Sequence, residues 1–472
     1  MTPTPMPPLT WKKSLFWLVL GAVCFNLAYA AIYLPVTGLL IFGYALALVR
    51  LTNQSTVRRA FYWGLATAYA SYAPQLSFFW RIFGPAAPVL WLILACWIGL
   101  FTALICGAAR RWGWPVAVWL IPVVWTGLEY FRSELYYLKF SWLNIGYVLP
   151  NLFLTPFLVY GMYGSGFVVF AIVSLLANWR RFHRSQLEYA VITVCSLVVM
   201  AWFFQFMAAT RYERPTPGVT LTGIQWEFPP ASILPKSLDQ ALRKHPDTQI
   251  FVLSEYTLAG PVPSQLKNWC RDHGRYLVIG GKEFVTNDVY YNAAFVVGTN
   301  GEIIFRQAKS VPIQFFQDGL PAPGQQVWDS PWGAIGICIC YDLSYTRVTD
   351  KLIREGAQLL IVPTMDVAEW GPHQHELHYR VAPVRAAEYH VPIFRLASSG
   401  ISQAVNANGT VLAQTTYPGP GDLLTAKLRL SAHSSRPLDR WLAPLCVLAT
   451  AALTALLLWL RWCDKCRPPL KS

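Results

Sequence analysis

Three residues that together could perform covalent catalysis follow three apolar stretches of the sequence. Glu255 ends the run "FVLSE", Lys309 follows "FRQA", and Cys340 ends "GICIC". A thiol with an ordinary pKa is mostly protonated at neutral pH, so it needs a base before it can act as a nucleophile. Glu255 could take that proton and later return it to a leaving group. Lys309 could stabilise the oxyanion that forms when the thiol attacks a carbonyl.

Each of these residues also has a non-catalytic interpretation. Most cysteines in strands are small buried hydrophobic residues, Glu255 could cap an element, and Lys309 could be a solvated loop charge. Their occurrence at three successive strand ends favours catalysis. Cys338 would point the same way along the strand as Cys340 but about 7 Å deeper, and we interpret it as core packing.

The elements that must position these residues lie in the stretch 212–435. Short runs rich in Val, Ile and aromatic residues predict strands, and strands that alternate with helices indicate a layered α/β domain. Roughly 220 residues are enough to bury a core. Asn300-Gly301 and Asn408-Gly409 predict hairpin turns, and no internal repeat is visible. Helices are predicted at 236–244, 262–274, 346–356 and 376–389.

The remainder of the chain has the composition of a membrane protein. Of the 472 residues, 54% are hydrophobic and only 13% are charged, which is too apolar for an ordinary soluble chain. Stretches of about twenty residues with almost no charge can cross a hydrocarbon layer about 30 Å thick. Eight such spans are predicted, at about 14–33, 34–50, 59–79, 88–108, 114–130, 152–175, 188–208 and 440–460.

Basic residues predict the orientation of these spans, because loops rich in Lys and Arg stay in the cytoplasm. With the N-terminus inside, the short outer loops hold only Arg81, Arg132 and Lys139. A seven-span domain, 1–211, then delivers the domain 212–435 to the outer face, and 436–472 holds the eighth span and a cytoplasmic tail. This topology largely explains the net charge of +14, and we infer no nucleic-acid partner.

The order Glu, Lys, Cys, with the cysteine in the context Cys340-Tyr341-Asp342, resembles the nitrilase superfamily. The run "EWGPHQHELHYRVAPVRAAEYHVPIFRLASSGISQAVNANGTVL" is similar to the last third of that family. The segment "LEYFRSELYYLKFSWLNIGY" resembles the membrane part of the apolipoprotein N-acyltransferases, which carry a nitrilase-like domain after seven spans. The resemblance therefore covers nearly the whole chain.

The resemblance implies an α-β-β-α sandwich on an eight-span helical membrane domain, with Glu255, Lys309 and Cys340 as catalytic residues. Tyr341 and Asp342 occupy the positions that support the family's nucleophile. It implies a phospholipid acyl donor, a Cys thioester, and a diacylated lipoprotein acceptor with a free N-terminal amine. It also implies the bacterial inner membrane, with the catalytic domain on the periplasmic side, and neither a cofactor nor a metal.

One departure from the family concerns a carboxylate. The family has a Gly-Glu pair soon after the Val-Pro that follows its lysine, whereas this chain reads Val311-Pro312-Ile313-Gln314. Asp318 is the candidate for the missing carboxylate. Because of this departure, two other classes of function stay open. One is a membrane-tethered amidase or hydrolase of the nitrilase type, and the other is a non-catalytic scaffold.

Four residues are candidates for substrate binding. Trp226 and Trp370 lie in the stretch 212–435, where a lid over the thiol is one interpretation. Trp142 could line a lipid entry, although aromatic residues at a membrane interface explain it equally well. Arg132 could contact substrate or simply pair with Glu129. The spacing of His373, His375 and His378 does not favour a metal site, because all three do not share one helical face.

Overall fold

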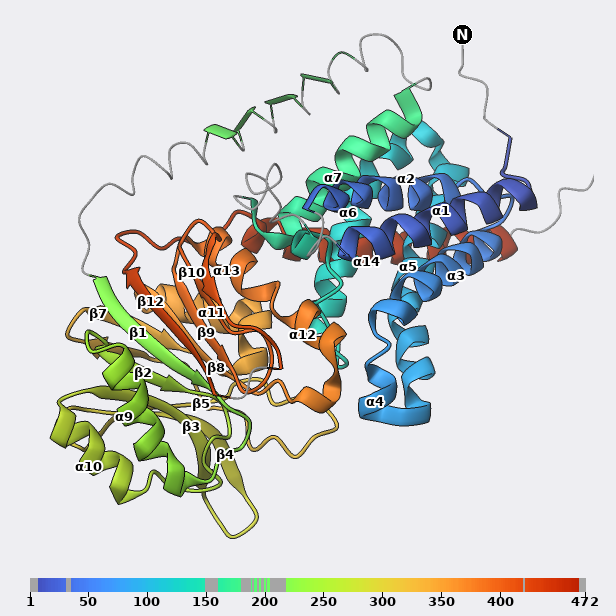
Figure 1. Cartoon of the computed structure of the whole chain (residues 1–472). Helices are drawn as coiled ribbons and strands as arrows, with labels where there is room; N and C mark the ends of the chain where they lie inside the picture. Colours follow the sequence, from blue (N-terminus) through green and yellow to red (C-terminus); the bar gives the residue numbers. More distant parts are fainter. Residues whose placement is uncertain are drawn as a thin grey trace, which may run out of the picture. The chain divides into compact units, whose positions relative to one another are not determined.

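Two units make up the chain (Figure 1). The computed structural model describes residues 7–30, 35–148, 160–179, 218–418 and 421–466, and between 180 and 217 only residues 188, 191, 192, 195, 196, 199, 200, 202 and 203. One unit, the helical unit, comprises Met1–Phe206 and Pro437–Ser472, and the other, the α/β unit, comprises Met207–Arg436.

The described part of the α/β unit contains two six-stranded sheets. Their strand orders are β12-β1-β2-β3-β4-β5 and β11-β10-β9-β8-β7-β6. The strands are β1 (Gly218–Gln225), β2 (Ile250–Leu253), β3 (Tyr276–Phe284), β4 (Tyr290–Val297), β5 (Ile303–Ala308), β6 (Val327–Ser330), β7 (Gly333–Ile337), β8 (Leu359–Thr364), β9 (Ile393–Ala397), β10 (Gln403–Val405), β11 (Val411–Gln414) and β12 (Asp422–Arg429).

The two sheets repeat one pattern of strand directions. In the first sheet β1, β2 and β3 are parallel, β4 and β5 follow antiparallel, and β12 flanks β1 antiparallel. In the second sheet β7, β8 and β9 are parallel, β10 and β11 follow antiparallel, and β6 flanks β7 antiparallel. The ends of β2 and β8 are therefore equivalent places in the two halves, although the sequence shows no repeat.

The sheets pack face to face at β1 and β9. A Cβ added to Gly223 on β1 would lie 2.3 Å from Leu396 Cδ1 on β9, so glycine lets the two strands approach closely. Strands β2, β8 and β9 are buried at every position, as expected for parallel strands covered on both faces. The result is the nitrilase-like α/β sandwich that the sequence predicts.

Helices complete the layers of the α/β unit. Apolar residues of α9 (Leu234–Lys244) and α10 (Ser264–His273) share one buried cluster with residues of β1 to β4, so these two helices cover the first sheet (Figure 1). Helices α11 (Thr346–Arg354), α12 (Pro372–His378) and α13 (Val381–Tyr389) connect β7, β8 and β9. The prediction of one helix over 376–389 was wrong, because Pro383 has no N–H to donate to the Tyr379 carbonyl and the helix is interrupted there.

Both predicted Asn-Gly hairpin turns are confirmed. Gly301 joins β4 to β5 and Gly409 joins β10 to β11, with φ values of 82° and 81°. A positive φ of this size favours glycine. The strands that follow these turns, β5 and β11, are the equivalent edge strands of the two sheets.

Within its described residues, the helical unit contains three helical stretches that are long and apolar enough to cross a membrane, Phe79–Trp112, Trp114–Leu135 and Asp439–Cys466. They include the predicted spans 88–108, 114–130 and 440–460. Val36–Leu51 and Met162–Asn178 are shorter apolar helices. Among the described residues the other predicted spans are not shown, and most of 188–208 lies outside them. Where the structure describes the unit, its α-helices are α1 (Trp11–Tyr29), α2 (Ile41–Leu51), α3 (Val57–Gln75), α4 (Phe79–Phe83), α5 (Ala87–Trp112), α6 (Trp114–Tyr130), α7 (Met162–Asn178) and α14 (Asp439–Cys466).

A buried carboxylate joins the last span to the rest of the helical unit. Asp439, at the start of α14, accepts hydrogen bonds from the backbone N–H groups of Tyr163 and Gly164, at 2.9 and 3.3 Å. These groups begin α7, where the N–H groups lack partners within the helix and the helix dipole favours negative charge. The chain therefore fixes α14 against α7 by a specific polar contact as well as by apolar packing.

Candidate active site

Glu255 lies two residues beyond β2 and is almost fully buried. Its Oε1 accepts hydrogen bonds from Lys309 Nζ at 2.8 Å and Asn292 Nδ2 at 2.6 Å, and its Oε2 accepts one from the backbone N–H of Met365 at 2.7 Å. All three partners are donors, so both oxygens act as acceptors. A carboxylate held in this way keeps one orientation, which a positioned base requires.

Lys309 follows β5 directly and is fully buried between two carboxylates. Its Nζ lies 2.8 Å from Glu255 Oε1 and 2.7 Å from Asp318 Oδ2. Asp318 also accepts hydrogen bonds from the Ile313 N–H at 2.8 Å and the Tyr256 hydroxyl at 2.7 Å. The structure thus brings together Glu255, Lys309 and Asp318, the carboxylate considered as a substitute for the family's missing glutamate.

Cys340 begins a short 3-10 helix, η8 (Cys340–Ser344), rather than ending a strand. Strand β7 stops at Ile337, so the expectation of a strand that carries Cys338 and Cys340 on one face was wrong. Cys340 has a φ of 52°, a conformation that costs a side-chain-bearing residue of order 1–3 kcal/mol. Such strain persists where a particular side chain must be presented, here a thiol at a strand-to-helix turn. Cys338 is fully buried.

The backbone of one residue, Met365, contacts both the thiol and the carboxylate. Cys340 Sγ lies 3.7 Å from the carbonyl oxygen of Met365, and the N–H of Met365 donates to Glu255. The charges of Glu255 and Lys309 both act on the Cys340 thiol. The structure therefore groups all three residues predicted to be catalytic in one buried centre.

The charges in this centre suit a protonated thiol and a nearby base. Burial raises the pKa of Glu255, and Lys309 only partly offsets that rise. Burial opposes ionisation of Asp318, but Lys309 lowers its pKa overall, so Asp318 remains the charged partner of the lysine. Burial and the Glu255 charge raise the pKa of Cys340 well above its ordinary value. The thiol at rest is protonated, so attack requires that its proton be removed.

Asp342 ties two parts of the centre together. Its carboxylate accepts hydrogen bonds from the backbone N–H groups of Ser310 and Val311, just after Lys309, and from that of Ile339, just before Cys340. Burial raises its pKa to about 6. Asp342 therefore fixes the loop of the lysine to the turn of the thiol. Its neighbour Tyr341 is buried with its ring edge-on to Tyr345, at a centroid distance of 4.9 Å.

Arg385 is a buried residue of the site whose role the sequence reasoning missed. It lies on α13, where its Nε donates to the carbonyl of Leu343 at 2.9 Å and its Nη2 to that of Ser344 at 2.7 Å. Its Nη1 pairs with Glu388. The guanidinium therefore anchors the two last carbonyls of η8, the turn that presents Cys340. The spacing "RAAE" is the only signal in the sequence that could have indicated this pair.

Replacing Arg385 by methionine is expected to cost about 3–5 kcal/mol of stability, because it breaks a buried ion pair. It should also slow alkylation of Cys340 by iodoacetamide in the folded fraction, because η8 loses two anchors. The double variant Arg385→Met/Glu388→Gln is the control, since it removes the unpaired charge. It should recover most of the melting temperature but not the alkylation rate. Full recovery of both would show that Arg385 does not hold the turn.

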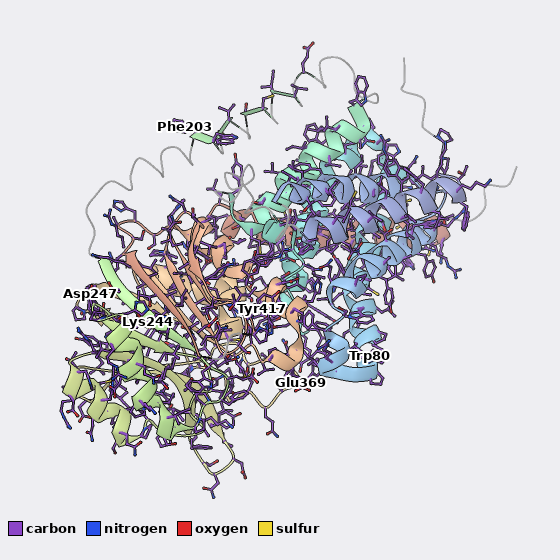
Figure 2. The ribbon with its side chains drawn as sticks, viewed as in Figure 1. Trp80, Phe203, Lys244, Asp247, Glu369 and Tyr417 are labelled. Carbon is purple, nitrogen blue, oxygen red and sulfur yellow. The ribbon has the colours of Figure 1, made fainter. Side chains whose placement is uncertain are left out.

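Trp226 and Trp370 both lie in the α/β unit. Trp226 follows β1 and packs half-buried against the core of the first sheet. Trp370 ends the short helix η9 (Ala368–Trp370), five residues beyond Met365, and its ring lies 6.2 Å from that of Phe316 in the loop of Asp318. Figure 2 labels the exposed Glu369 of the same helix. A role in substrate binding remains a prediction for both tryptophans.

Trp142 and Arg132 belong to the helical unit. Trp142 is buried, with its ring 5.5 Å from Phe140. Arg132 donates to the hydroxyl of Tyr72 at 3.3 Å and to Asn144, and with Glu129 it lines a small pocket among aromatic side chains. The proposed lipid contacts of these two residues stay predictions.

The histidines considered for a metal site have other partners. His378 Nδ1 lies 2.8 Å from Asp366, and His375 packs its ring against Tyr417, which Figure 2 labels. In residues 218–418 and the other described parts, no group of three or more His, Cys, Asp or Glu side chains is placed to hold a metal ion.

Comparisons with known proteins match both units. The family model described as carbon-nitrogen hydrolase matches residues 227–436, and the apolipoprotein N-acyltransferase N-terminal domain matches residues 21–176. An apolipoprotein N-acyltransferase of Geobacter metallireducens is 24% identical over 428 residues, 76% of this chain and 79% of that protein.

Two further relatives match shorter stretches. An apolipoprotein N-acyltransferase of Bdellovibrio bacteriovorus is 25% identical over 37% of this chain and 39% of its own length. The deaminated glutathione amidase of Mus musculus is 26% identical over 40% of this chain and 65% of its own length.

Proposed function

Because this chain belongs to the apolipoprotein N-acyltransferase family, a membrane-embedded branch of the nitrilase superfamily, we propose that it acylates lipoproteins through a thioester on Cys340. The acyl donor is a phospholipid, and the acceptor is the N-terminal amine of an S-diacylglyceryl cysteine. The observation that carries this proposal is the buried group of Glu255, Lys309 and Asp318, joined to the thiol of Cys340 through the backbone N–H and carbonyl of Met365.

In the first step Cys340 Sγ attacks the ester carbonyl of the phospholipid while Glu255 takes the thiol proton. The carbonyl oxygen becomes an oxyanion, and Lys309 stabilises its charge in a site that excludes water. The C–O bond to the glycerol oxygen then breaks, and Glu255 returns its proton to that oxygen. A lysophospholipid leaves, and the acyl group remains on sulfur.

In the second step the amine of the acceptor attacks the thioester carbonyl. Glu255, again unprotonated, takes a proton from the attacking nitrogen, and Lys309 again stabilises the oxyanion. The C–S bond breaks, an amide forms, and the sulfur recovers its proton from Glu255. Asp318 remains charged through both steps, so Lys309 keeps a fixed partner while the charge of Glu255 changes.

The chemistry of the substrates supports a membrane location for this reaction. Exposing an acyl chain to water costs about 0.8 kcal/mol for each methylene, so transfer is favoured at a bilayer surface. The three apolar helical stretches supply the attachment to the membrane. The distribution of basic residues supports the inner membrane of a bacterium, with the α/β unit in the periplasm.

A hydrolase is the second candidate, because the match to carbon-nitrogen hydrolases covers the α/β unit that holds Cys340. In that function water replaces the amine in the second step, and a free fatty acid is released. The first step and its residues are the same, so only the acceptor separates the two functions.

Mass spectrometry of a lipoprotein N-terminus, in cells with and without this gene, tests the proposal. We expect a third acyl chain, in amide linkage, only when the gene is present, because no other step in the scheme adds one. Fatty acid release without N-acylation would assign the chain to the hydrolases. Identical N-termini in both strains, with no fatty acid released, would contradict both functions.

A further inference from the structure

A second buried acid centre lies after β8, in the second sheet of the α/β unit, the sheet that also carries Cys340 after β7. Asp366 follows β8 by two residues, as Glu255 follows β2 by two residues, and β2 and β8 are equivalent strands of the two sheets. Asp366 is fully buried and pairs with the guanidinium of Arg395 on β9. Gln374 Nε2 donates to it at 2.9 Å.

His378 on α12 completes this centre. Its Nδ1 lies 2.8 Å from Asp366 Oδ1, and burial lowers the pKa of the imidazole to about 4, so the ring is neutral at neutral pH and donates to the carboxylate. Asp366 and Arg395 therefore form a compensated ion pair with two further donors. The first sheet does not repeat the nucleophile at the matching place, because the residue three beyond the end of β1, equivalent to Cys340 three beyond the end of β7, is Phe228. Both residues have a positive φ, 52° for Cys340 and 45° for Phe228.

The second acid centre touches the first through one stretch of backbone. The carbonyl of Met365 accepts from Cys340 Sγ, the N–H of Met365 donates to Glu255, and Asp366 is the next residue. The N–H of Asp366 donates to Ser398 Oγ at 3.0 Å, and the carbonyl of Asp366 accepts from the same hydroxyl at 3.1 Å. Side chain and backbone of Asp366 thus hold the segment that separates the thiol from its base.

We propose that Asp366, with Arg395 and Ser398, is a positioning group that fixes the backbone of Met365, whose carbonyl contacts Cys340 and whose N–H contacts Glu255. In this interpretation the first sheet supplies Glu255 and Lys309, the second sheet supplies Cys340, and the acid centre after β8 supports the backbone between them. The proposal rests on the proposed function for the roles of Cys340 and Glu255. It adds one requirement to the roles of Cys340 and Glu255. The carbonyl and the N–H of Met365, which contact these two residues, must be held rigidly.

The test uses the full-length protein and two readouts that do not need the natural lipid. The first is the rate at which p-nitrophenyl acetate acylates Cys340, followed as the burst of p-nitrophenol. The second is the pH at which iodoacetamide alkylation of Cys340 is half-maximal. A displacement of about 1 Å between reacting groups can cost about 100-fold in rate.

We expect Asp366→Asn to lower the acylation rate about 100-fold and to move the alkylation midpoint to lower pH, because a negative charge that acts on the thiol is removed. Ser398→Ala changes no charge. It should lower acylation about tenfold and leave the alkylation midpoint in place. In Asp366→Asn the thiol is thus more easily ionised and yet is acylated more slowly. A loss of stability alone would not produce this combination.

Acylation at the wild-type rate by both variants would overturn the proposal. If Asp366→Asn does not fold, Ser398→Ala decides the matter, because its expected loss of rate does not depend on a buried charge. A wild-type protein that gives the burst but never acylates a lipoprotein would contradict the proposed function and leave the positioning role supported by the variants.

Discussion

A Cys340→Ala protein is expected to form no acyl-enzyme. Incubated with a phospholipid that carries a labelled acyl chain, the wild-type protein should take up a label that neutral hydroxylamine removes, as it removes thioesters. Without Sγ there is no atom to hold the acyl group, and neither Glu255 nor Lys309 can replace it. The expected loss of lipoprotein acylation is complete within the limits of the assay, the largest effect of any single substitution in this chain.

Cys338→Ala is the matched control for this result. Cys338 is two residues away and fully buried, and burial raises the pKa of its thiol well above the ordinary value, so it should neither be acylated nor be needed. Its loss leaves a small cavity, and the label should persist. Cys340→Ser should give either no label or one that resists neutral hydroxylamine. A hydroxylamine-sensitive label on Cys340→Ala would place the acyl group on another residue and end the thioester scheme.

The positions of Glu255 and Lys309 could be predicted because each depends on local sequence. An apolar run that ends in a charged residue places that residue at the edge of a sheet, and parallel strands bring their carboxyl ends to the same edge. Lys309 follows β5 directly, and Glu255 lies two residues beyond β2. The Asn-Gly turns were predictable for the same reason, since their backbone conformation is set by the two residues themselves.

The turn that carries Cys340 could not be predicted in this way. Alternating small and branched residues in "GICIC" favour a strand by local pattern, but β7 ends at Ile337. Contacts that this pattern does not contain hold the turn, because Asp342 binds the backbone at Ser310 as well as at Ile339, and Arg385 binds the carbonyls of η8. Such partners are fixed only when the two sheets have packed.

For the membrane spans, single stretches could be located from the sequence, whereas the number of spans depends on the whole unit. Hydropathy located the three stretches that are long enough to cross a bilayer, because length and apolarity are properties of a local window. The number of spans depends also on the other segments, of which Val36–Leu51 and Met162–Asn178 are shorter than a full span. Eight spans therefore remain a prediction of the sequence.

Replacing Glu255 by glutamine is expected to slow formation of the thioester by about 1,000-fold, within the range of 10²–10⁴ that general bases contribute. The substitution keeps the size of the side chain. It nevertheless removes the base, and it turns one acceptor oxygen into an NH₂ group in a site where Lys309, Asn292 and the Met365 N–H are all donors. In at least one of these contacts, an N–H donor of the protein then faces the new NH₂ donor of the glutamine.

The pH dependence separates loss of the base from loss of the fold. In the wild type, thioester formation should rise with pH as Glu255 loses its proton, and then level off. In Glu255→Gln it should keep rising about tenfold for each pH unit until the thiol itself ionises. Loss of the Glu255 charge lowers the pKa of Cys340, because that charge helps to raise it, so alkylation by iodoacetamide at pH 9 should be at least as fast as in the wild type. If Glu255→Gln kept both the wild-type rate and its plateau, the thiol would have to lose its proton to another group, and Asp318, the other carboxylate on Lys309, would be the first to test.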